Sequence, residues 1–120
     1  MVNPQSSDLA NYLKEQFADD LDILEEFFSA FSQAKAGYKQ KLNEAYLSGN
    51  IAELGEICHE IKGVISNLGQ SECWHLLQNT EQSIAEGTYG GNWNQEHFEQ
   101  VLEQLSEDVR VFIASVNRPA

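Results

Sequence analysis

Apolar side chains recur every three or four positions along most of this chain, the spacing that lets an amphipathic helix bury one face. Strict alternation of apolar and polar residues and runs of β-branched residues, both typical of strands, are missing. The two prolines, Pro4 and Pro119, stand near the ends, so no proline interrupts the interior. The pattern therefore predicts an all-α fold.

Five helices with short connections are expected. The first is short and begins near Ser7 or Asp8, either of which can cap it. Gly49 and Gly69 are expected to end the second and third helices, and Ser71 to cap the fourth. The later four helices are expected over residues 19–47, 51–68, 71–86 and 94–116.

The inward stripes of the long helices have the spacing of a bundle seam. In the third helix the stripe runs from Ile51 through Cys58 to Leu68, and in the fifth from Phe98 to Val116. Four long amphipathic helices with short connections predict an antiparallel four-helix bundle, and the short first helix is an additional N-terminal element across one end. We expect one domain over residues 1–120, with 1–6 and 117–120 as flexible ends.

Charge narrows the choice of partners. The chain has 19 acidic and 7 basic residues, a formal net charge of −12. Such a chain repels phosphate backbones and anionic lipid, so nucleic acid and membrane surfaces are poor partners. The start lacks the features of a signal peptide, no apolar run approaches a membrane span, and there are only two cysteines. We therefore expect a cytoplasmic protein with reduced thiols, and a monomer.

One histidine stands out by its position on the third helix. His59 follows the seam residue Cys58 and is therefore rotated by about 100° from it, toward water. Gly55 and Gly63 lie inside the third helix, where each glycine lowers helix stability by roughly 1 kcal/mol relative to alanine. This cost suggests a compensating role, either close approach by a partner or close helix packing. The residues expected beside His59 on this stripe are Gly55, Glu56, Lys62, Gly63 and Ser66.

An open imidazole of this kind is suited to carrying a phosphoryl group. Neutral imidazole is a competent nucleophile, and the positive charge of Lys62, one turn away, would stabilise a phosphoryl group on His59. There is no Walker loop, no Gly-rich nucleotide loop and no Ser-His-Asp arrangement. We therefore expect a phosphocarrier rather than an autonomous enzyme.

The third helix also carries a motif. The stretch from Cys58 to Gly69, CHEIKGVISNLG, resembles the signature of the histidine phosphotransfer (HPt) family of two-component phosphorelays. That signature is a histidine, an apolar residue two positions later, Lys-Gly, and a Leu-Gly or similar pair further on. The matching residues are His59, Ile61, Lys62, Gly63, Leu68 and Gly69. Helix order and length also look like that family over nearly the whole chain.

The resemblance implies a phosphorelay intermediate. His59 would accept a phosphoryl group, on its outer ring nitrogen, from the aspartate of a receiver domain and pass it to another receiver, with a hybrid sensor histidine kinase upstream. Mg²⁺ would belong to the receiver, so no cofactor is expected here. By the same likeness Lys62 assists electrostatically, and Glu81 lies where related domains often carry Glu or Gln near the histidine. The expected partner-binding residues are Gly55, Gly63, Val64 and Ser66.

Departures and alternatives stay open. Val64 and Ile65 stand where family members often have small residues, which bears on partner choice more than on chemistry. Tyr38 is a further apolar candidate for partner contact. The alternatives are a receiver- or kinase-binding adaptor that transfers no phosphate, a purely structural bundle, and a domain excised from a larger sensor kinase. The start at Met1 favours a stand-alone protein.

The remaining polar residues are expected to play ordinary roles. Neighbouring helical residues diverge by about 100°, so Cys58 and His59 can hardly chelate one metal ion together, and no metal site is expected. Cys73, like Cys58, is expected in the core. Three lysines of the second helix are expected to form a solvated face: Lys35, Lys39 and Lys41.

Overall fold

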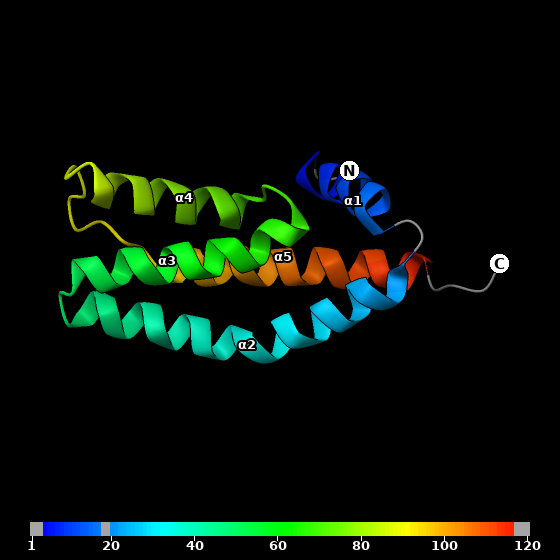
Figure 1. The fold of residues 1–120 in the computed structure, drawn as a ribbon, viewed down its shortest axis with the longest axis horizontal. Helices are drawn as coiled ribbons and strands as arrows, with labels where there is room; N and C mark the ends of the chain where they lie inside the picture. Colours follow the sequence, from blue (N-terminus) through cyan, green and yellow to red (C-terminus); the bar gives the residue numbers. More distant parts are fainter. Residues whose placement is uncertain (1–3, 18–19, 117–120) are drawn as a thin grey trace.

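The computed structural model describes the backbone of residues 4–17 and 20–116, and the side chains of residues 8–17 and 20–116. All secondary structure in these ranges is helical, which confirms the all-α expectation (Figure 1). Residues 1–3 and 117–120, which include most of the expected flexible ends, lie outside the described residues. The elements are α1 (Pro4–Phe17), α2 (Leu21–Leu47), α3 (Ile51–Ile65), the short 3₁₀ helix η1 (Ser66–Leu68), α4 (Glu72–Ala85) and α5 (Gln95–Val116).

Short polar side chains begin three of these helices. Asp20 accepts a hydrogen bond from the backbone N–H of Ile23 to start α2, and Asn50 accepts one from Glu53 to start α3. Ser71 caps α4 as the sequence predicts, accepting from the backbone N–H of Trp74. These caps satisfy N–H groups that the first helical turn leaves without a partner.

The start of the first helix and the end of the third differ most from expectation. The first helix begins at Pro4 rather than near Ser7 or Asp8, because proline has no N–H to lose and its φ suits the first turn. The third α-helix ends at Ile65 rather than at residue 68, and the chain tightens into η1 before Gly69 turns away with φ of +92°. That left-handed conformation is one glycine adopts readily.

The predicted stripes form one core. Cys58, Ile61, Ile65 and Leu68 are buried in α3 and η1, and Phe98, Leu102 and Val109 are buried in α5. Two predicted core positions are wrong: Ile51 and Val116 are 47% and 37% exposed. Each is the terminal residue of its helix, where less of the neighbouring helices remains to cover an apolar side chain.

The helices pack lengthwise into a molecule of 52 × 26 × 23 Å. In Figure 1, α3 lies between α2 and α4, and the contacts place α5 against both α2 and α4. The first helix, α1, lies at one end, where it contacts α5, α2 and η1. The Tyr12 ring lies 3.2 Å from the position a Cβ would take on Gly69, so a side chain there would crowd the ring. Within the described residues, no helix is both long and apolar enough to cross a membrane.

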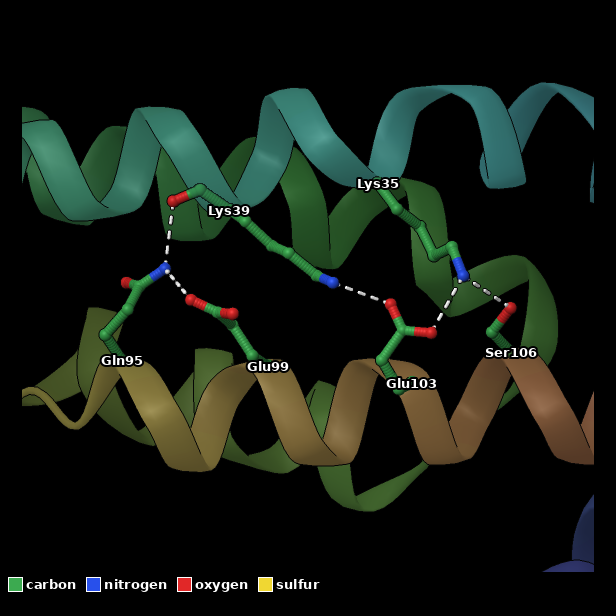
Figure 2. Close-up of polar contacts among 6 residues, drawn as sticks. All are labelled: Lys35, Lys39, Gln95, Glu99, Glu103 and Ser106. Carbon is green, nitrogen blue, oxygen red and sulfur yellow. Dashed lines mark hydrogen bonds and ion pairs between the residues drawn. The ribbon is translucent and has the colours of Figure 1, made fainter.

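A polar clamp, made of Lys35, Lys39, Glu103 and Ser106, joins α2 to α5 (Figure 2). Lys35 and Lys39 bind the two oxygens of Glu103 at 3.0 and 2.7 Å, and Lys35 also donates to the buried hydroxyl of Ser106. The expectation of a solvated lysine face is therefore wrong for these two lysines, which face α5. It holds for Lys41, which is exposed. Spacing along one helix does not reveal that a carboxylate stands opposite on another.

Candidate functional site

The α3 helix presents His59 to solvent. Cys58, one position earlier, is fully buried, whereas the His59 side chain is 70% exposed. This contrast is what a rotation of about 100° per residue produces when the preceding residue points into the core. The imidazole therefore stands on the outer surface of the helix, where a second protein can reach it.

The α4 helix supplies the residue that orients this imidazole. Glu81 places its Oε1 atom 2.7 Å from Nδ1 of His59. The Glu81 side chain is only 26% exposed, so it reaches the histidine from the side that faces α4. One ring nitrogen is thus engaged by the protein, while Nε2, on the other side of the ring, makes no described contact.

Lys62 joins the same cluster. Its Nζ atom lies 2.7 Å from Oε2 of Glu81 and donates a hydrogen bond to Oε1 of Gln78 at 2.5 Å. It also lies 5.9 Å from the centroid of the Trp74 ring, within the range of a cation–π interaction. Glu81 therefore binds His59 with one oxygen and pairs with Lys62 through the other.

Charge fixes where the imidazole proton lies. Desolvation raises the pKa of Glu81, but the hydrogen bonds and charges of Lys62 and His59 outweigh it and lower the pKa overall. Glu81 is therefore ionised at neutral pH and can only accept hydrogen bonds. The neutral imidazole must then carry its proton on Nδ1, an assignment that follows from the hydrogen-bond network, and Nε2 keeps a free lone pair.

The expected partner-binding residues do not all lie on one face. Gly63 and Ser66 are exposed beside His59, and nothing stands within 4 Å of a Cβ built on Gly63. Val64 is half-buried. Gly55, in contrast, is buried, and a Cβ there would meet the side chain of Ile84 at 3.4 Å. Gly55 therefore serves close packing of α3 on α4, one of the two roles that the sequence left open for it.

The α2 helix places an aromatic side chain, that of Tyr38, close to α3. Tyr38 is half-buried, and desolvation together with the negative charge of Glu60 raises its pKa. Glu60 is exposed on α3, one position after His59. Tyr38 therefore remains neutral at pH 7 and lies close enough to α3 for the charge of Glu60 to act on it.

The cysteines belong to the core, as the sequence predicts. Both are free thiols, and burial raises the pKa of Cys58 and of Cys73 to about 12. Such thiols are neither good nucleophiles nor ready metal ligands. Among residues 8–17 and 20–116, no three His, Cys, Asp or Glu side chains are grouped so that they could hold a metal ion.

Comparisons with family models, with curated proteins and with solved structures give no match to this chain. Any assignment of function therefore depends on the chain's own residues and their geometry.

The sequence did not identify Gln78 as part of this cluster, and it did not indicate that Trp74 contacts Lys62. Glu81 was expected only through the family resemblance. A signal was present, because Trp74, Gln78 and Glu81 follow one another at helical spacings of four and three residues and so share one face of α4. What the sequence does not contain is the register of α4 against α3, which brings that face to Lys62.

Proposed function

We propose that this protein is a histidine phosphotransfer domain. His59 accepts a phosphoryl group from the aspartate of a receiver domain and passes it to the aspartate of another receiver. A hybrid sensor histidine kinase supplies the relay upstream, and the protein works as a cytoplasmic monomer. It is a phosphocarrier, so the catalytic Mg²⁺ belongs to the receiver.

The observation that carries this proposal is the environment of His59. Its Nδ1 atom is held by ionised Glu81, and its Nε2 atom faces solvent from a side chain that is 70% exposed. An enzyme that acts on a small substrate by itself would instead need a concave pocket to hold that substrate against the reacting atom. An outward nucleophile on an open helix surface fits a reaction whose other half arrives on a second protein.

The chemistry follows from this geometry. The Nε2 lone pair of His59 attacks the phosphorus of the aspartyl phosphate in line, the P–O bond to the aspartate breaks, and the aspartate leaves as a carboxylate. The proton on Nδ1 stays shared with Glu81, so the attack needs no separate base. Lys62 contributes positive charge close to the developing phosphohistidine.

The arrangement of helices supports the same proposal. We take α2 to α5 as an antiparallel four-helix bundle with α1 as the additional N-terminal helix, since α3 contacts α2 and α4, and α5 contacts the same two helices. The first helix is not short as expected, because α1 has 14 residues, as many as α4. The exposed Gly63 and Ser66 place only small side chains on the surface beside His59. A receiver can therefore bring its aspartate against the imidazole without displacing a side chain.

Transfer from phosphorylated receivers tests this proposal. The protein is incubated with a panel of phosphorylated receiver domains and Mg²⁺, and the phosphoryl group is located by intact and peptide mass spectrometry. We expect an acid-labile, alkali-stable group on His59 that is absent from a His59→Gln variant. His75→Gln is the matched control, because His75 is an exposed histidine on α4, and it should accept phosphate normally.

Two results would contradict the proposal. A His59→Gln protein that still accepts phosphate would place the chemistry elsewhere. A folded protein that binds receivers but takes phosphate from none of them would instead support the adaptor function.

A further inference from the structure

All the described side-chain contacts of Lys62 are with α4, and none is with His59. Lys62 forms an ion pair with Glu81, donates to Gln78 and lies beside the ring of Trp74, all three of which belong to α4. Its side chain is only 18% exposed, whereas that of His59 is 70% exposed. A lysine whose only task was to meet an incoming phosphoryl group would not need these partners.

We propose that Lys62 has two positions, and that Gln78 and Trp74 are positioning residues that hold it on α4 while His59 is unmodified. When His59 carries a phosphoryl group, Lys62 leaves Gln78 and Trp74 and binds the phosphoryl oxygens, while it stays close to Glu81. This inference rests on the proposed function and adds a means of setting the direction of phosphoryl flow.

Charge drives the exchange. Gln78 offers Lys62 a neutral carbonyl oxygen, and Trp74 offers the face of a ring. A phosphoryl group offers several charged oxygens, so Lys62 gains there the attraction between opposite charges, which a neutral carbonyl oxygen does not supply. Glu81 favours retention of Lys62 nearby, because its buried Oε2 atom has the Lys62 ammonium, 2.7 Å away, as its partner. The movement is therefore a local change of partner.

The contacts of Lys62 with Gln78 and Trp74 alter the equilibrium between phosphohistidine and the phosphoaspartate of the receiver. They stabilise only the unmodified state, because Lys62 gives them up when His59 is phosphorylated. They therefore raise the tendency of phosphohistidine to donate its group to a receiver. Removing one of them should shift the equilibrium toward phosphorylated His59.

A Gln78→Leu variant tests this consequence. The phosphoryl group is allowed to equilibrate between His59 and the receiver that charges it, and the two phosphorylated forms are quantified. Loss of one hydrogen bond should raise the ratio of phosphohistidine to phosphoaspartate about fivefold. Gln82→Leu is the matched control, because Gln82 lies one turn further along α4 and its side chain bonds Glu86 rather than Lys62; it should leave the ratio unchanged.

Side-chain NMR of Lys62 tests the movement itself. Phosphoramidate serves as a small donor: its P–N bond breaks, Nε2 of His59 forms the new bond to phosphorus, and ammonia leaves. Before this reaction the Lys62 Hε resonances should lie upfield because of the Trp74 ring, and a Trp74→Leu variant should lose that shift. After the reaction they should move toward ordinary lysine values.

The outcomes separate this inference from the proposed function. Phosphorus on His59 with unmoved Lys62 resonances, or an unchanged ratio in Gln78→Leu, overturns the two-position lysine and leaves the phosphocarrier intact. No phosphorus on His59 from either donor overturns both.

Discussion

At the scale of single residues, the site depends on Glu81. The carboxylate fixes the His59 proton on Nδ1 with one oxygen and compensates the charge of Lys62 with the other. The sequence predicts His59 and Lys62 from spacing and motif alone, because both lie on one helix. Glu81 is 22 residues beyond His59, and only the packing of α4 against α3 brings it within 2.7 Å.

A Glu81→Ala variant should lose the orientation of the imidazole. We expect the Nδ1–H tautomer, read from the ¹⁵N chemical shifts of His59, to lose its predominance and the rate of phosphoryl transfer to fall roughly tenfold, equivalent to about 1.4 kcal/mol in the barrier. Glu81→Gln keeps an acceptor oxygen, so its rate of phosphoryl transfer should fall by a smaller factor. Glu86→Ala removes a carboxylate at the end of the same helix and serves as control. Wild-type transfer in Glu81→Ala would show that the hydrogen bond has no role.

At the scale of helices, α3 combines a core face with an exposed histidine face. Its apolar periodicity is strong enough for the sequence to predict the helix and the burial of Cys58, Ile61 and Ile65. The end of the helix could not be predicted, because η1 continues the same apolar spacing with different backbone geometry. The two glycines looked alike in sequence, yet Gly55 packs on α4 whereas Gly63 is open.

Replacing Gly63 by alanine should separate stability from function. Alanine is the better helix former and would meet nothing at this position, so we expect the free energy of unfolding to rise by up to about 1 kcal/mol. The added methyl group lies beside His59, so transfer should slow several-fold. Gly37→Ala, on the exposed surface of α2, should gain stability without slowing transfer. Urea unfolding and transfer kinetics test both, and equal kinetics in the two variants would argue against a docking role for Gly63.

The clamp between α2 and α5 should respond to acid. The hydrogen bond from Lys39 is the largest cause that lowers the pKa of Glu103; desolvation opposes it, and Lys35 adds to the lowering. A pKa lowered by folding contributes stability above the ordinary carboxyl pKa, and the contribution is lost as pH falls through the lowered value. Glu103 is 49% exposed, so solvent screens the pairs and we expect only about 0.5 kcal/mol at pH 7.

Urea unfolding of Glu103→Gln across the acidic range measures this effect. The variant should be less stable than the wild type at pH 7, and the difference should shrink as the pH falls through the carboxyl range. Glu26→Gln is the control, because Glu26 is exposed on α2 and forms no ion pair among the described residues, and its effect should be smaller. A difference for Glu103→Gln that persists undiminished in acid would mean that its ion pairs are not the cause.

At the scale of the whole molecule, composition and periodicity predict the helical class but not the contacts between helices. A net charge of −12 is common to many acidic proteins. Among the described residues, four cations pair with a carboxylate: Lys35, Lys39, Lys62 and Arg110. Two of those lysines were expected to be solvated, because a single helix face reveals nothing about its partner. The packing of α5 on α2 determines the clamp, and the packing of α4 on α3 determines the site.

The most direct test of the central claim is a ¹H–³¹P correlation spectrum of the protein after phosphorylation. We expect phosphorus bonded to Nε2 of His59, the nitrogen that Glu81 leaves free. Phosphorus there couples to both ring protons, Hδ2 and Hε1, so two cross-peaks from one histidine are expected. A single cross-peak to Hε1 would place the group on Nδ1 and contradict the assigned role of Glu81. Correlation to His75 or His97, or none at all, would contradict the assignment of His59 as the phosphoryl carrier.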